Sequence, residues 1–223
     1  TGVRSFGQVV DSSSITLIPR LSFYSNEKSA DLLLHLPQGM INKQLNIKLI
    51  QSNRILFELK KKVDKEIIVM PVDLTSITST ANMEVEIQVA RWNSSLESQK
   101  YISKCNLIIL PHKSNEVKTD RLTGGLMVNG RQFFPFGFYC YSPVHPTLPE
   151  EEIVKGFNMI SPYQKILPET LHERKAYMDR CAQIGMKVHY NLLSVSGGGG
   201  VGSKIDDISD EEKRSRMIEE IKT

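Results

Sequence analysis

Alternation of apolar and polar residues in the first half of the chain constrains its fold more than any other feature. Residues 83–92 read Met-Glu-Val-Glu-Ile-Gln-Val-Ala-Arg-Trp, and residues 44–51 read Gln-Leu-Asn-Ile-Lys-Leu-Ile-Gln. Because successive side chains of a strand point to opposite faces, a period of two indicates strands with one buried face and one polar face. Both segments are therefore predicted to lie in antiparallel sheets that are packed on one side.

Further short apolar runs, separated by turn residues, surround these two segments. They cover residues 15–24, 30–36, 55–63, 66–74 and 104–110. None of them has a helical period, and several short strands at regular spacing are typical of an antiparallel sandwich. We therefore predict an immunoglobulin-like β-sandwich domain over residues 1–123, with Trp92 in or near its core. Its last part, residues 111–123, is polar and is interpreted as a linker or as an edge of the sandwich.

The pattern changes after Gly125, where strands and helices begin to alternate. Asn129-Gly130 between two short apolar runs is a strong hairpin signal, and the apolar run 136–141 predicts a strand covered on both faces. The elements expected after it are a helix over 149–155, a strand over 157–163, a helix over 169–184 that ends at Gly185, a strand over 186–193 and a helix from Ser209-x-x-Glu212 to the end. This order is that of parallel strands joined by helical crossovers.

Three motifs in this second half occur in the order and spacing of a known barrel. Residues 128–139, Val-Asn-Gly-Arg-Gln-Phe-Phe-Pro-Phe-Gly-Phe-Tyr, resemble the hairpin and first barrel strand of clan A glycoside hydrolases. Residues 156–160, Gly-Phe-Asn-Met-Ile, resemble their second strand, and residues 182–188, Ala-Gln-Ile-Gly-Met-Lys-Val, resemble the start of the third. A β-sandwich before the barrel is the arrangement of the β-galactosidase/β-glucuronidase-like type. The resemblance implies that residues 124–223 form the first three βα units of an incomplete TIM-type (β/α)8 barrel.

The same resemblance implies hydrolysis of glycans, without a cofactor, by one carboxylic acid and one nucleophilic carboxylate. In this clan they stand at the ends of the fourth and seventh barrel strands. Only three strands are predicted here, and the stretch from Phe134 to Thr223 is far shorter than the ~250 residues of a full barrel. No catalytic residue is therefore assigned. The chain is expected to be a fragment of a longer glycoside hydrolase-like protein whose catalytic carboxylates lie beyond Thr223.

Active sites of such barrels lie at the carboxyl ends of the strands. Tyr141, Tyr163 and Asn191 lie at or near the ends of the three predicted strands and are the candidate carbohydrate-binding residues, because aromatic rings stack on sugar faces and amides bind hydroxyls. The alternative is that residues of this kind pack in the barrel wall. The glycine-rich segment 196–203 lacks the Lys-Ser/Thr ending of a phosphate-binding loop and is interpreted as a mobile loop on the same side. No metal site is predicted.

Composition argues against several classes of function. A net charge of +3 is too small to indicate a nucleic-acid-binding protein, and no apolar run approaches the ~20 residues of a transmembrane helix. Three cysteines, Cys105, Cys140 and Cys181, lack a metal-binding spacing, and their pairing is left open. Asn93 lies in an Asn-Ser-Ser glycosylation sequon, which fits an extracellular or secretory-pathway protein. The oligomeric state is not predicted.

Two other functions stay open beside the hydrolysis or binding of glycans. One is that of a non-catalytic extracellular carbohydrate-binding, adhesion or structural protein that keeps a glycosidase-like scaffold. The other is that of a barrel enzyme with a different chemistry, because a fold does not fix a function.

Overall fold

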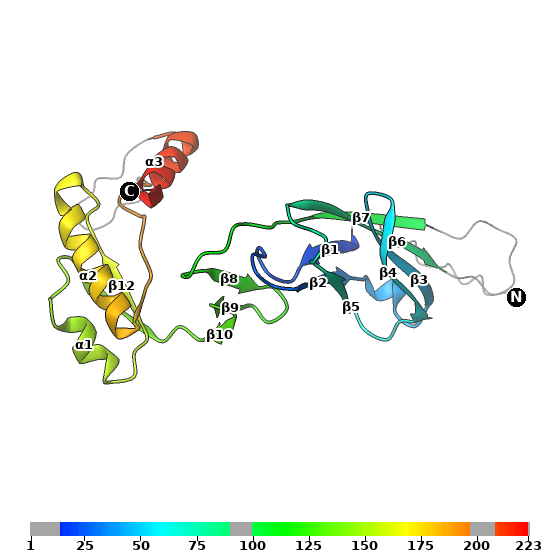
Figure 1. Cartoon of the computed structure of the whole chain (residues 1–223), viewed down its shortest axis with the longest axis horizontal. Coiled ribbons are helices and arrows are strands. Elements are labelled where there is room, and N and C mark those ends of the chain that lie inside the picture. Colours follow the sequence, from blue (N-terminus) through cyan, green and yellow to red (C-terminus); the bar gives the residue numbers. More distant parts are fainter. Residues whose placement is uncertain (1–13, 90–99, 197–207, 223) are drawn as a thin grey trace, which may run out of the picture. The chain divides into compact units, whose positions relative to one another are not determined.

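The structure, a computed structural model, describes residues 14–89, 100–196 and 208–222. The chain divides into two compact units, Thr1–Phe134 and Pro135–Thr223, and each is described by itself (Figure 1). Trp92 and the Asn93 sequon lie outside the described residues, as does most of the glycine-rich segment 196–203. Among the described residues, no helix has the length and apolar character needed to cross a membrane.

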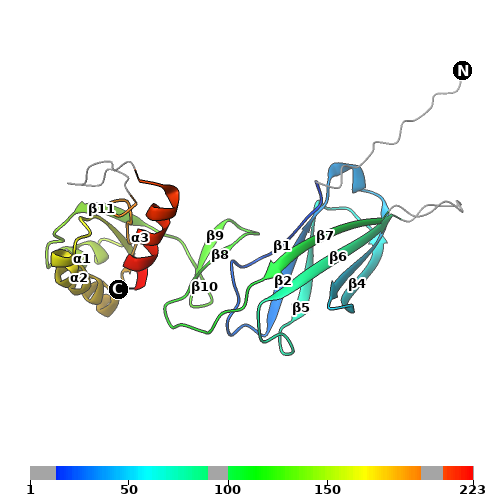
Figure 2. The ribbon, with the colours of Figure 1, turned by 90° about the horizontal axis from the view of Figure 1, so that it is seen from above.

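Seven antiparallel strands of the first unit form two sheets that share one hydrophobic core (Figures 1 and 2). One sheet has the order β1-β2-β5 and the other has the order β4-β3-β6-β7. The strands are β1 (Thr16–Pro19), β2 (Ser29–His35), β3 (Gln44–Gln51), β4 (Arg54–Lys62), β5 (Ile67–Asp73), β6 (Ala81–Val89) and β7 (Lys100–Leu107). A short 3-10 helix, Gln38–Met40, lies between β2 and β3. The prediction of a β-rich, largely antiparallel protein is confirmed.

The buried face of each central strand follows the alternation of the sequence. The buried residues are Leu45, Ile47 and Leu49 of β3 and Met83, Val85 and Ile87 of β6. Burial of one such aliphatic side chain contributes about 1.5–3 kcal/mol. A slip of one residue would turn this face to solvent, so the pattern favours the observed register, in which Ile47 pairs with Ile87. The outer face is polar and carries cross-strand ion pairs such as Lys104–Glu84 at 2.9 Å.

The first strand is shorter than the predicted segment 15–24. It ends before Arg20, whose guanidinium binds two carboxylates, Asp31 at 3.0 Å and Asp120 at 2.9 Å. Because Asp31 belongs to β2 and Asp120 to β8 (Val117–Asp120), this arginine connects the sandwich to a second, smaller sheet.

The smaller sheet has the order β10-β9-β8 and includes the predicted hairpin (Figure 2). β9 (Gly125–Val128) and β10 (Arg131–Phe133) are antiparallel and are joined by Asn129 and Gly130. Both turn residues have positive φ, 49° and 73°, which is the conformation of a two-residue hairpin turn favoured by Asn-Gly. The hairpin prediction is confirmed.

The segment 111–123 contains β8 and three buried charged residues, Glu116, Lys118 and Asp120. Lys118 Nζ lies 2.5 Å from Glu27 Oε1 and 3.1 Å from Glu116 Oε2. Buried charges need partners of opposite sign, because an isolated charge loses its hydration. Glu27, which precedes β2, and Arg20, which binds Asp120, come from the sandwich, so these two ion pairs hold the segment against it.

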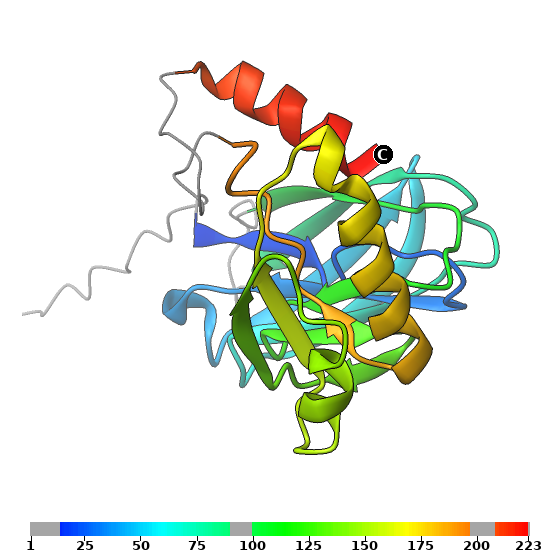
Figure 3. The same ribbon diagram turned by 90° about the vertical axis from the view of Figure 1, so that its left-hand side faces the viewer.

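The second unit contains a parallel sheet of the order β11-β12-β13 with helices between its strands (Figure 3). The elements are β11 (Gly137–Tyr141), α1 (Leu148–Ile153), β12 (Met159–Tyr163), a 3-10 helix (Pro168–Thr170), α2 (Leu171–Ile184), β13 (Lys187–Val188) and α3 (Asp210–Lys222). Ile160 of β12 and Cys181 of α2 are fully buried in a second hydrophobic core. The predicted alternation of strands and helices is present in the described residues.

Local sequence signals set several boundaries in this unit. Gly185 ends α2 with a φ of 82°, the left-handed conformation that glycine favours. Ser209 Oγ accepts a hydrogen bond from Glu212 N at 3.2 Å and so caps α3. At Gly137 of β11 a Cβ atom would lie 2.6 Å from the carbonyl oxygen of Met159, so the close approach of β12 requires glycine.

Two predictions for this unit are wrong. The strand expected over 186–193 is reduced to Lys187–Val188, because the chain turns at Asn191, whose side chain binds the backbone of Leu193. The strand at 136–141 was expected to be covered on both faces, but Tyr139 is 71% exposed and Tyr141 is 75% exposed. Within this unit α1 and α2 pack on the other face of the sheet, and tyrosine tolerates exposure because its ring carries a polar hydroxyl.

Candidate functional site

The two faces of the parallel sheet differ in character. Phe138 and Ile160, at paired positions of β11 and β12, pack in the core formed with α2. Because side chains alternate along a strand, the neighbouring residues face the opposite side. In register, these residues form the pairs Tyr139↔Ser161 and Tyr141↔Tyr163. The face directed away from α2 is therefore polar and aromatic.

Three tyrosines on this side, Tyr139, Tyr141 and Tyr163, form a group that we call the tyrosine face. The centroid of the Tyr163 ring lies 6.0 Å from that of Tyr139 and 6.4 Å from that of Tyr141, with the rings tilted. Tyr141 and Tyr163 are the last residues of their strands, so the group lies at the carboxyl end of the sheet. The rings present apolar surface, and their hydroxyls present hydrogen-bonding groups.

A serine and a histidine lie beside the tyrosine face. Ser161 Oγ is 2.9 Å from His189 Nδ1, and His189 N donates to Ile160 O, which continues the pairing of β13 by one residue. In the described parts of the chain no carboxylate binds His189, so the pair lacks the group that orients the base in a serine hydrolase. The pair can instead fix the orientation of the imidazole next to a bound ligand.

The third predicted residue, Asn191, is placed differently from the two tyrosines. Its Oδ1 accepts a hydrogen bond from Leu193 N at 2.8 Å and so stabilises the turn that follows β13. The structure thus brings Tyr141 and Tyr163 into one group. The Oδ1 atom of Asn191 is instead used in a local turn.

A buried ion pair between α2 and α3 was not predicted from the sequence. Arg174 of α2 is 3% exposed and contacts the Tyr190 hydroxyl and the Glu220 carboxylate through the same guanidinium nitrogen. Tyr190 in turn donates to Glu220 Oε1 at 2.5 Å, and burial together with this hydrogen bond raises the pKa of Tyr190 to about 12. The contacts fix α3 to α2 and to the residues after β13. One sequence signal could have predicted these contacts. Arg174 is three residues before Tyr177 and seven before Cys181, a spacing that places a charged residue on the buried face of α2.

Two acidic residues of α1 are paired with cations. Glu150 pairs with Arg180, and Glu152 pairs with Lys155 at 2.7 Å. Across the described ranges no group of three or more His, Cys, Asp and Glu side chains could hold a metal ion. The groups available for binding at the carboxyl ends of the strands are therefore aromatic rings, hydroxyls, imidazoles and amides.

No family model and no curated protein sequence matches the chain. Among solved structures, the crystal structure of CHIR-AB1 is similar with a TM-score of 0.33 and 16% identity, over 44% of this chain and 96% of that chain. A GH2 beta-galacturonidase from Eisenbergiella tayi bound to galacturonate is similar with a TM-score of 0.25 and 9% identity, over 78% of this chain. The match spans 33% of the galacturonidase chain. Neither similarity is close enough to assign a function, which is therefore inferred from the residues themselves.

Proposed function

We propose that the chain is part of a glycoside hydrolase-like protein and that its tyrosine face belongs to a carbohydrate-binding rim. In this proposal β11, β12 and β13 are the first three strands of a (β/α)8 barrel, with α1, α2 and α3 in its outer layer. Three observations support it: the strands are parallel, a helix follows each of them, and the tyrosine face lies at their carboxyl ends. Binding sites of barrel enzymes lie at that end.

The observation that carries the proposal is the exposure of grouped aromatic rings. Tyr139 and Tyr141 each leave more than two thirds of their surface open, and both contact Tyr163. Grouped exposed aromatic side chains commonly mark binding surfaces. A pyranose ring has one apolar face and a rim of hydroxyls, so it can stack on a tyrosine ring while its hydroxyls bind neighbouring polar groups. His189, which is exposed, supplies such a group beside the rings, and the buried Ser161 hydroxyl binds its imidazole.

Hydrolysis would require two carboxylates across the glycosidic bond. As far as the structure describes this face, its strand positions carry glycine, methionine, serine, tyrosine, lysine and histidine, and none carries an acidic residue. We therefore assign carbohydrate positioning to this chain and place the catalytic carboxylates in other strands of the parent protein.

The sandwich enters the proposal as an accessory domain of the immunoglobulin-like type. Its strand order, β1-β2-β5 facing β4-β3-β6-β7, supports that assignment because seven antiparallel strands in two sheets are typical of such domains. Glycosylation of Asn93 and an extracellular location are parts of the same proposal. Expression in a secretory host tests them: a mobility shift that a glycosidase removes, and that an Asn93→Gln variant lacks, would support both.

A glycan array probed with the 223-residue chain, followed by calorimetric titration of the best ligand, tests the proposed binding. Tyr141→Ala and Tyr163→Ala should each weaken binding about fivefold or more, because loss of one stacking ring is worth on the order of 1–3 kcal/mol. Tyr141→Phe keeps the ring and should stay within about threefold of the parent. Val154→Ala, at an exposed apolar position of the same unit, is the control. Absence of any glycan ligand, or alanine variants that both bind as tightly as the parent chain, would refute the proposal.

A further inference from the structure

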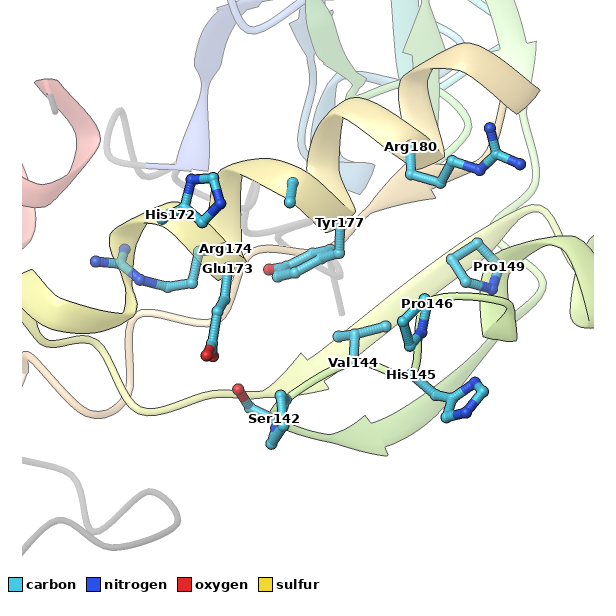
Figure 4. Close-up of a pocket in the computed structure, with 12 residues that line it drawn as sticks. Ser142, Val144, His145, Pro146, Pro149, His172, Glu173, Arg174, Tyr177 and Arg180 are labelled. Atoms are coloured by element: carbon cyan, nitrogen blue, oxygen red, sulfur yellow. The ribbon is translucent and has the colours of Figure 1, made fainter.

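A cavity of about 710 Å³ lies between α2 and residues 142–149, which comprise the loop after β11 and the start of α1 (Figure 4). We propose that it binds a small organic cation with an apolar body. None of the residues that line it belongs to the tyrosine face, so it is a separate site. Its volume falls within the range of small-molecule sites, about 300–1,000 Å³.

The walls of the cavity are mainly apolar. Val144 and Pro146 line it from the loop and Pro149 lines it from α1. Ala176 and Tyr177 line it from α2. The Tyr177 hydroxyl donates to Gln164 Oε1, which fixes the orientation of the ring. Figure 4 shows this ring on the side of α2 that faces Val144 and Pro146. A rigid aromatic and proline-rich wall suits the apolar part of a ligand.

The charges around the cavity leave one carboxylate without a partner. Arg174 is paired with Glu220, and Arg180 is paired with Glu150. Glu173, which lines the same cavity, has no hydrogen-bond or ion-pair partner among the residues that the structure describes. Figure 4 shows its carboxylate directed from α2 towards the loop that begins at Ser142. The unpaired charge of the wall is therefore negative, which favours a positively charged ligand.

The position of this carboxylate relative to the ring strengthens the preference for a cation. Glu173 and Tyr177 are four residues apart on α2, so they lie on one face of the helix. An ammonium group near Glu173 can bind the carboxylate while it lies close to the aromatic ring, which also attracts cations.

The test is a titration of two small-molecule probes into the 223-residue chain at pH 8 and low salt. Binding is measured from the NMR shifts of the backbone amides. The probes are 2-phenylethylamine and its neutral analogue 2-phenylethanol. The amine should bind about fivefold more tightly, which is the effect of one partly exposed ion pair. The amide shifts that the amine causes should concentrate in residues 142–149 and in α2. Glu173→Gln should abolish the preference for the amine and leave the affinity for the alcohol within about twofold, since only the charge is removed.

Two further variants locate the site. Asp179→Asn removes the same charge from the same helix but does not line the cavity, and it should keep the preference for the amine. Ala176→Trp places a large ring in the cavity and should abolish the binding of both probes. Equal affinities of the two probes, an unchanged preference in Glu173→Gln, or binding that survives in a folded Ala176→Trp protein would each overturn the proposal. The glycan experiments on Tyr141 and Tyr163 do not depend on any of these outcomes.

Discussion

Replacement of Glu116 by glutamine should make the protein less sensitive to acid. Glu116 is buried and accepts hydrogen bonds from Ser25 Oγ at 2.7 Å and from Lys113 N at 2.9 Å, and the Lys118 ammonium lies 3.1 Å away. Burial by itself would raise the pKa of this carboxyl. The hydrogen bonds and the lysine charge outweigh burial and lower the pKa of Glu116 from 4.5 to about 2.

The size of the effect follows from the linkage between protonation and folding. The pKa of Glu116 is lower in the folded chain than in the unfolded chain, so its contribution to stability is fully present above pH 4.5 and is lost as the pH falls towards 2. Each pH unit of difference corresponds to about 1.4 kcal/mol, so the contribution is about 3 kcal/mol. Glu116→Gln should lower the free energy of unfolding by up to this amount at pH 7 and by little near pH 2.

Urea unfolding followed by far-UV circular dichroism, repeated between pH 7 and pH 2, measures this difference. The matched control is Glu58→Gln, which removes an exposed carboxylate paired with Lys60 at 3.2 Å on the surface of the sandwich. Exposed pairs contribute about 0–1 kcal/mol, so this variant should follow the parent chain at every pH. If the parent and Glu116→Gln lost the same free energy between pH 5 and pH 2, the assignment of acid sensitivity to the buried ion pairs would be refuted.

Three further substitutions test other parts of the fold. Ile47→Ala in the sandwich core should lower the free energy of unfolding in urea by about 2–5 kcal/mol. Ile55 is 49% exposed, so Ile55→Ala should lower it by about 0.5 kcal/mol. Equal losses would contradict the assigned core. Gly137→Ala places a Cβ atom 2.6 Å from Met159 O and should speed amide exchange in β11 and β12, and unchanged protection there would count against the close strand pairing. Arg174→Leu leaves Glu220 without its cation and should speed amide exchange in α3 but not in the sandwich; a protected α3 would argue against this ion pair as its anchor.

Local patterns predicted the elements whose determinants lie close together in the sequence. The alternation at residues 83–89 predicted the buried face of β6, because a strand has a fixed period of two. Asn129-Gly130 predicted the β9–β10 hairpin, and Gly185 predicted the end of α2, because few residues adopt positive φ at low cost. Each of these signals is complete within about ten residues.

The features that were not predicted depend on partners far away in the sequence. Lys118 is polar and looks solvated in its segment, but its carboxylate partner Glu27 is 91 residues away. The exposure of Tyr139 could not be read from the run 136–141, because a continuous apolar strand is consistent with one covered face or with two. For the candidate site, the sequence pointed to Tyr141 and Tyr163, whereas their contact and the His189–Ser161 pair required the register of the sheet.

The contact between Arg20 and Asp120 also bears on the order in which the molecule is made. It joins residues that are 100 positions apart, and contacts of large sequence separation form slowly because a long loop must close first. During synthesis, Arg20 and Asp31 leave the ribosome well before Asp120 is added. We therefore expect the strands of the sandwich to pair while one carboxylate of this cluster is still missing. The chain can complete the cluster only when β8 has emerged, so docking of that strand follows the pairing of the sandwich strands.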